Sequence, residues 1–203
     1  MKSIATAALA ALSICAAAAT VSAEPVGNTS ALIPNASQIP PQGTRSDLKL
    51  RDPIIRNAEL ATAERGALEV TFLDGSKLTM GQNSRLTVDE YVYTGPGGTG
   101  KQTVRYTKGL FRFLSGSIPK ENVKVETPTV TIGIRGTIFR SALDEDGSGA
   151  ISVEWGPNGE EYEVVLTSKK TGKTIVLKSG QKVSFDNVGV FEGIVDGQVE
   201  GCN

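Results

Sequence analysis

Short runs in which hydrophobic and polar residues alternate fill most of the chain. Leu68, Val70 and Phe72 share one face of such a run, and the Asp74-Gly75-Ser76 sequence then turns the chain. A period of two is typical of a half-buried strand, and turn-forming residues follow about every eight to twelve residues, as in all-β folds. The pattern therefore predicts an all-β chain with no long helix, in which only residues 56–65 are a candidate for a short one.

The connections between these runs favour a solenoid-like or rolled β-sheet of many short strands. Only two to four residues separate several runs, as at Asp74-Gly75 and at Thr127-Pro128. Apolar positions also recur at similar spacing, for example from Leu78 to Leu86, although no fixed period of the kind that marks a regular solenoid is present. A β-sandwich is the alternative.

The ends of the chain predict its organisation. Lys2 precedes a run of mostly Ala, Leu, Ile and Val, and Val21-Ser22-Ala23 fits the small-residue rule for cleavage, so residues 1–23 are expected to be a signal peptide removed on export. Residues 24–46, rich in Pro, Ser and Asn, are expected to be a flexible tether. The all-β domain is assigned to residues 47–195 and a C-terminal tail to residues 196–203.

The net charge and the cysteine content limit the kinds of partner that the mature chain is expected to bind. Cleavage after Ala23 removes one of the 21 Lys and Arg residues and none of the 22 Asp and Glu residues, so the mature net charge is −2. That balance argues against nucleic-acid binding. The mature chain contains no second long apolar stretch, so no membrane span is predicted there. Cys202 is then the only cysteine, so it is either a residue of a frayed tail or the site of an intermolecular disulfide.

The chain has no histidine, which removes the commonest general base and the commonest metal ligand. A Ser-His-Asp or Cys-His arrangement cannot form. The adjacent carboxylates Asp89-Glu90 and Glu160-Glu161 would point to opposite faces of a strand. We therefore predict that the protein is not an enzyme, with no catalytic residue and no cofactor.

Two polar loops resemble ligand-binding motifs. The sequence from Gly95 to Gln102 nearly spells a phosphate-binding loop, but Gln102 replaces the Mg²⁺-binding Ser or Thr and a strand follows in place of a helix, which favours a hairpin loop. Asp144, Asp146 and Ser148 occupy the first ligand positions of a calcium loop, but the closing Glu is missing. These three residues are therefore only weak calcium candidates, and a polar hairpin turn is favoured.

A series of short motifs follows in order along the chain, between about Asp52 and Gly180. Its residues are Asp74, Gly75, Gly109, Phe111, Thr127, Pro128, Arg135, Gly136 and Thr137. This series resembles the FecR domain, the extracytoplasmic part of bacterial iron-uptake signalling proteins. The glycines, with Gly133, are candidates for positive φ or close backbone approach. Arg135 is expected to be a partly buried charge held by backbone carbonyls or by a carboxylate such as Glu126, or else to dock a partner.

The resemblance implies a binding or signalling module of the bacterial envelope, periplasmic or secreted. Sigma-factor control is not carried over, because a cleavable signal and a β domain are expected here without the family's cytoplasmic segment and membrane helix. The first hypothesis is therefore a non-enzymatic exported module that binds an envelope protein, through an exposed sheet edge. The alternative is a structural, matrix or cell-wall-associated scaffold.

Overall fold

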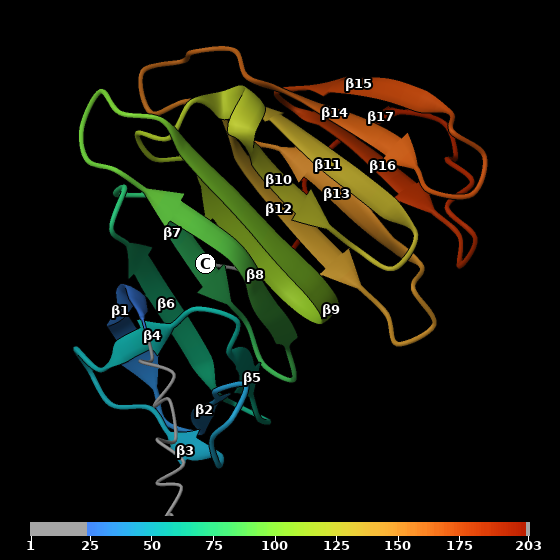
Figure 1. The fold of residues 1–203 in the computed structure, drawn as a ribbon. Coiled ribbons are helices and arrows are strands. Elements are labelled where there is room, and N and C mark those ends of the chain that lie inside the picture. Colours follow the sequence, from blue (N-terminus) through green and yellow to red (C-terminus); the bar gives the residue numbers. More distant parts are fainter. Residues whose placement is uncertain (1–23, 202–203) are drawn as a thin grey trace, which may run out of the picture.

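The computed structural model describes residues 24–201 and contains almost only strands there. Seventeen strands and one 3₁₀ helix, η1 (Lys120–Asn122), are assigned in these residues. All the strands join one continuous sheet that does not close on itself. The predicted all-β class of many short strands is confirmed. The open sheet folds over into two layers (Figure 1), which is consistent with both the rolled sheet and the β-sandwich alternative.

Each layer is a row of hydrogen-bonded strands, and both rows share the long strand β9 (Gly100–Leu114). In order, layer A contains β4 (Pro53–Ile55), β1 (Pro25–Ile33), β6 (Ala67–Phe72), β7 (Lys77–Met80), β9, β12 (Ile138–Leu143), β13 (Gly149–Val153), β16 (Gln181–Phe185) and β17 (Val195–Asp196). Layer B contains β3 (Ser46–Asp47), β2 (Ala36–Ile39), β5 (Glu59–Thr62), β8 (Arg85–Tyr93), β9, β10 (Val123–Glu126), β11 (Val130–Arg135), β14 (Glu163–Ser168) and β15 (Thr174–Lys178).

Strand β9 passes from one layer to the other at Gly109. Residues before it pair with β8 and β10, whereas Gly109 and the residues after it pair with β12 and β7. Gly109 has φ +110°, and a Cβ atom there would lie 2.2 Å from Ser84 Oγ. Only glycine fits this bend, because it alone tolerates both the positive φ and the close approach.

The core lies between the two layers and is built from the alternating positions that the sequence pattern identified. Tyr106 and Phe111 stack across the bend with ring centroids 4.0 Å apart, and Phe113 packs against Phe139 at 5.7 Å. All four side chains are fully buried. Offset aromatic pairs of this kind add to the stabilisation from burial alone.

The expected tether is replaced by strands in the structure. Residues 25–33 form β1, which pairs with β4 and β6, and residues 36–39 form β2, which pairs with β5 and β3. Val26 and Ala36 are buried, and a Cβ atom on Gly27 would lie 2.5 Å from the Thr71 carbonyl oxygen. The segment is ordered because its backbone groups complete the ladders of distant strands, which outweighs its low apolar content.

The end of the described chain is also held against the sheet. Val199 is buried, its N–H donates to Ser152 Oγ at 2.8 Å, and the Gln198 amide bonds the Val153 carbonyl at 2.8 Å. Residues 197–199 therefore cross the outer face of layer A. Residues 1–23, predicted to be a signal peptide, and Cys202 lie outside the described residues.

The short-helix candidate at residues 56–65 is wrong, because this stretch contains β5, and Leu60 is fully buried in the core. Within residues 24–201, no helix is long and apolar enough to cross a lipid bilayer.

Candidate functional site

The Asp74-Gly75-Ser76 turn between β6 and β7 forms a buried hydrogen-bonded cluster with Tyr91, which we call the Asp74 node. Asp74 Oδ1 accepts hydrogen bonds from Ser76 N at 3.1 Å and from Ser76 Oγ at 2.6 Å. The Tyr91 hydroxyl accepts a bond from the Asp74 N–H at 2.8 Å and lies 3.3 Å from Asp74 Oδ1. Because a buried carboxylate is costly unless it is hydrogen-bonded, these contacts make the node possible. Gly75 supplies the positive φ of the turn, +83°.

Two ionisable groups beside Asp74 have shifted pKa values. Burial, and then the negative charge of Asp74, raise the pKa of the Tyr91 phenol well above its usual 10.0, so this hydroxyl stays protonated. Burial lowers the pKa of the Lys120 ammonium, although Asp74 acts in the opposite direction. The node therefore combines one carboxylate, one neutral phenol and one partly desolvated lysine.

The segment Ser115–Ser117 connects this node to the Arg135-Gly136-Thr137 loop. Ser117 N and Oγ both donate to the Asp74 carbonyl at 2.9 Å, while Ser115 Oγ accepts a bond from Thr137 N at 3.2 Å. Between them, a Cβ atom on Gly116 would lie 2.4 Å from Ser76 N. The structure therefore brings together two parts of the motif series that are about 60 residues apart in the sequence.

Lys120 extends the cluster to the protein surface. Its ammonium donates to the Gly116 carbonyl at 2.5 Å and to Ser115 Oγ at 3.1 Å. Lys120, Lys124 and Arg135 surround an open cavity of about 600 Å³ on the outer face of layer B, whose floor includes Gly133 and Val165. We call this cavity the Gly133 hollow. Gly133 has no positive φ, and a Cβ atom there would meet only Val165 at ordinary distances of 3.6 and 3.8 Å.

Arg135 lies on the surface, so the expectation of partial burial beside Glu126 is wrong. Its side chain is 64% exposed and pairs with Glu163 at 3.1 Å, whereas Glu126 pairs with Lys169 at 3.2 Å. The reason is the alternation along β11, where Val130, Ile132 and Ile134 face the core and Arg135 faces outward. Gly136 follows with φ +71° and no atom within 4 Å of a Cβ position, and Thr137 is buried.

The remaining motif residues support the fold. Thr127 Oγ1 accepts bonds from Val130 N at 2.9 Å and Thr129 N at 3.3 Å, which closes the turn over Pro128 between β10 and β11. Gly109 forms the bend of β9, and Phe111 is fully buried in the core. Positive φ is confirmed at Gly75, Gly109 and Gly136, whereas Gly133 makes neither a positive φ nor a close approach.

The two ligand-like loops are hairpin turns. Asp144, Asp146 and Ser148 form the turn between β12 and β13, where Ser148 N and Oγ donate to Asp146 Oδ1 at 2.9 and 2.6 Å. These bonds lower the pKa of the exposed Asp146 carboxyl. The Gly95–Gln102 sequence connects the antiparallel strands β8 and β9, and Lys101 pairs with Glu90 at 2.9 Å. In residues 24–201, no group of three or more His, Cys, Asp or Glu side chains is arranged to hold a metal.

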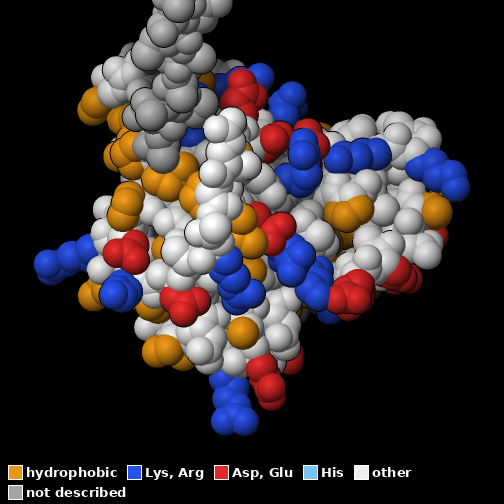
Figure 2. All heavy atoms as spheres, turned by 60° about the horizontal axis from the view of Figure 1, so that its bottom comes forward, with side chains coloured by type: hydrophobic (Ala, Val, Ile, Leu, Met, Phe, Trp, Pro, Cys, Tyr) orange, Lys and Arg blue, Asp and Glu red, His pale blue; other side chains and the backbone are white. Residues whose placement is uncertain are grey.

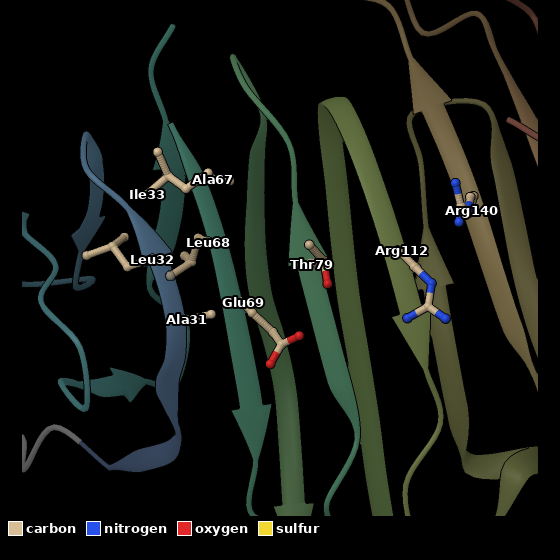
Figure 3. Close-up of a pocket in the computed structure, with 9 residues that line it drawn as sticks. All are labelled: Ala31, Leu32, Ile33, Ala67, Leu68, Glu69, Thr79, Arg112 and Arg140. Carbon is tan, nitrogen blue, oxygen red and sulfur yellow. The ribbon is translucent and has the colours of Figure 1, made fainter. Parts of the chain in front are cut away.

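A second cavity, of about 430 Å³, lies on the outer face of layer A (Figure 3). Ala31 and Ile33 of β1 form its apolar end, and Arg112 and Arg140 lie at its other end. Glu154 bonds Arg112 at 2.8 and 3.0 Å and Arg140 at 2.6 Å. Burial works to raise the pKa of Glu154, but the hydrogen bonds and charges of both arginines outweigh it and lower that pKa.

One face of the molecule carries mixed charge. In Figure 2, basic and acidic side chains are interleaved across the face shown, and hydrophobic side chains gather along one side of it. Sequence reasoning missed Tyr91, Ser115, Ser117 and Lys120, as well as the Arg112–Glu154–Arg140 cluster. Tyr91 shares the buried face of Leu86 and Val88 only because a bulge at Val88 and Glu90 shifts the register, so the alternation in the sequence does not reveal it.

Comparison with known proteins gives a family and a fold. Residues 58–157 match the sequence model of the FecR protein family. Two crystal structures of a proposed anti-sigma factor from Parabacteroides distasonis ATCC 8503, at 2.50 and 1.65 Å resolution, align with 69% of this chain, both with a TM-score of 0.51, at 17% and 18% identity. The aligned region is 60% of the length of those chains. No match was found among curated proteins.

Proposed function

The chain carries a FecR domain at residues 58–157, and we propose that it acts as a non-enzymatic, exported signalling-accessory module that binds another protein of the bacterial envelope. FecR proteins are envelope-associated and regulatory, which supports this assignment. A structural or matrix scaffold of the cell wall is the competing function.

One observation carries the proposal: part of the motif series faces solvent and is not used by the core. Arg135 and Gly136 line the Gly133 hollow, while Asp74, Gly109 and Thr127 are taken up by turns and bends of the fold. Exposed polar residues in a loop held by a rigid sheet are typical of binding sites. Lys120, Lys124 and Arg135 outnumber Glu121 among the charged residues that line the hollow, although Arg135 also pairs with Glu163 at 3.1 Å. This excess of positive charge suits an acidic segment of a partner.

Four carboxyl groups with lowered pKa values fit a binding role better than a hydrolytic one. Glu145, Asp146 and Glu160 are exposed and have lowered pKa values, and Glu154 is clamped by two arginines. A general acid at neutral pH needs a raised pKa, so these groups are poorly suited to acid catalysis. The absence of histidine from the whole sequence removes the usual alternative.

In-cell crosslinking with an affinity tag tests the proposal. A tag within residues 24–46, the expected tether, would disrupt β1 or β2, so it belongs between Gly97 and Gly98, in the exposed loop that connects β8 and β9. We expect saturable capture of one envelope protein, either an outer-membrane receptor or an anchored signalling protein. Recovery of only cell-wall material, or of the chain itself, would reject the binding function and favour the scaffold.

A substitution in the Gly133 hollow tests whether the captured protein binds there. Gly133→Leu fills the hollow without backbone strain, because Gly133 has an ordinary φ and room for a Cβ atom. We expect it to reduce capture by about tenfold, the equivalent of about 1.4 kcal/mol of binding energy. Gly193→Leu is the control: Gly193 has no atom within 4 Å of its Cβ position and no part in the hollow, so capture should be unchanged.

A further inference from the structure

Strand β15 is a free edge of layer B. It pairs with β14 on one side, and no strand in residues 24–201 pairs along its other side. Figure 1 shows it as the outermost strand at the end of the molecule opposite β1–β5. An unpaired edge presents a row of N–H and C=O groups that can accept another strand.

The outward backbone groups of β15 can be assigned from one hydrogen bond. The Lys178 N–H points away from β14, because it donates to Gln181 Oε1 at 2.9 Å. In an antiparallel pair these directions alternate along the strand, so Thr174 and Val176 also direct their N–H and C=O groups to the free side, while Ile175 and Leu177 bond β14. The edge thus offers the backbone groups of Thr174 and Val176 to an incoming strand.

The side chains along this edge are basic with an apolar centre. Residues 164–185 contain five lysines and no acidic residue, although the whole chain has a net charge of −1. Two of the five pair with acidic residues outside this range, Lys178 with Glu161 at 3.8 Å and Lys169 with Glu126 at 3.2 Å. Lys170 and Lys173 lie exposed in the turn before β15, and Lys178 ends the strand. Val176 is 43% exposed between them. Such a surface is complementary to an extended segment that carries carboxylates on either side of an apolar residue.

An exposed aromatic residue flanks the far end of the edge. Trp155, the only tryptophan of the chain, is 54% exposed. Its indole lies against the turn that follows β15, where a Cβ atom on Gly180 would lie 3.1 Å from Trp155 Nε1. Tryptophan is enriched among the residues that dominate binding energy at protein interfaces.

We propose that β15 is the docking edge of this module, and that it adds to layer B an extended, acidic strand of the partner, with Trp155 covering the end of that strand. The inference rests on the proposed binding function and adds a second contact surface for the partner, in the same layer as the Gly133 hollow. A second copy of this chain is disfavoured as the occupant, because pairing of two β15 edges would bring Lys173 and Lys178 of both copies together.

Site-specific photocrosslinking in living cells is the test. Benzoylphenylalanine replaces Val176, and in the control it replaces Val92, a valine of similar exposure (46%) on β8, five strands away in layer B. We expect an adduct from position 176 to a single protein, at an extended segment with several Asp or Glu residues, and no such adduct from position 92.

Three variants of the tagged protein complete the test. Val176→Pro removes the outward N–H without breaking the ladder to β14, since proline is tolerated at such edge positions, and we expect capture to fall about tenfold. Val176→Thr keeps the edge N–H and should retain capture. The double variant Lys170→Glu/Lys173→Glu changes only exposed side chains. A loss of capture in this variant therefore shows that the positive charge of the edge contributes to binding, even if the proline variant fails to fold.

The outcomes separate the two proposals. Capture that survives both Val176→Pro and Lys170→Glu/Lys173→Glu, or equal adducts from positions 176 and 92, overturns the docking edge but leaves the binding function standing. An adduct to a second copy of the chain overturns the acidic partner. If the wild-type protein captures nothing, both proposals are wrong.

Discussion

The sequence Asp-Gly-Ser occurs twice in this chain, and the structure gives both copies the same local geometry. Asp74 and Asp146 each accept bonds at Oδ1 from the N–H and hydroxyl of the serine two residues on, at 3.1 and 2.6 Å in the first turn and 2.9 and 2.6 Å in the second. The central glycines have φ +83° and +87°. Both turns close an antiparallel hairpin, as this turn chemistry favours.

Their surroundings differ. Asp74 is 5% exposed and meets Tyr91 from β8 and Ser117 from the loop after β9, whereas Asp146 lies in solvent at the tip of its hairpin. The comparison shows that three residues suffice to specify the turn, while residues distant in the sequence decide whether the turn becomes a structural node. A short motif therefore predicts local structure better than it predicts a role.

Replacing each aspartate by alanine should separate the two turns most strongly. Asp74→Ala leaves Ser76 N–H and the Tyr91 and Ser76 hydroxyls without their buried acceptor, and we expect unfolding free energy to fall by about 3 kcal/mol. Asp146→Ala, the matched control, should leave the denaturation midpoint unchanged. Urea denaturation followed by Trp155 fluorescence measures both. Equal effects would show that the node is no more than a turn.

Removing one distant partner should give a smaller loss. Tyr91→Phe keeps the ring that stacks on Phe72 at 5.6 Å but leaves the buried Asp74 N–H unpaired, which should cost about 2 kcal/mol at pH 7. No residue plays the same part at Asp146, so this dependence is expected in one turn only. Tyr93→Phe, which removes a hydroxyl bonded to Ser117 at the surface, is the control and should cost less.

Tyr91→Phe should also change how the stability of the protein depends on alkaline pH. The folded-state pKa of Tyr91 is raised above its usual 10.0, so the folded protein favours the neutral phenol. Its contribution to stability is complete below pH 10 and is lost as pH rises above 10, because the unfolded chain then ionises first. Wild type should therefore lose stability above pH 10 more steeply than Tyr91→Phe. Parallel curves for the two proteins would contradict the shift.

Substitution of the two central glycines tests the local backbone geometry that both turns share. Gly75→Ala and Gly147→Ala force alanine into a left-handed conformation, at a cost of about 1 kcal/mol each. The cost should be slightly larger at Gly147, whose Cβ atom would lie 3.2 Å from Thr129 Cγ2, whereas nothing lies within 4 Å at Gly75. A much larger loss at Gly75 would mean that the node depends on the glycine itself and not on the aspartate.

The alternation of side chains predicted the strands where one face meets the core. The runs at residues 68–72 and 130–134 are examples, because burial of alternate residues leaves a direct mark on the sequence. The outward position of Arg135 could have been predicted in the same way, since Val130, Ile132 and Ile134 all face inward. Its expected burial ignored that alternation.

Long-range pairing left no such mark. The apolar residues of strand β1 do not alternate regularly, and its order comes from ladders with residues about 25 to 45 positions away. Likewise, Ser115 and Lys120 belong to the candidate site only because the chain brings their neighbours Asp74 and Thr137 to the same place. Single-sequence patterns record burial, whereas contacts between distant polar groups depend on the assembled sheet.

Added calcium should have the smallest effect on stability. It could reach only the exposed one of the two turns. The carboxylate of Asp74 is enclosed by hydrogen-bond donors, so only Asp144 and Asp146 could meet an ion from solvent. That turn lacks the closing bidentate Glu of a calcium loop, and Ser148 already occupies Asp146 Oδ1. We expect about 1 mM calcium, the range of weak extracellular sites, to leave the thermal midpoint unchanged. A calcium-dependent rise that Asp146→Ala abolishes would instead make the second turn a cation site, and the contrast between the two turns would then be one of function as well as burial.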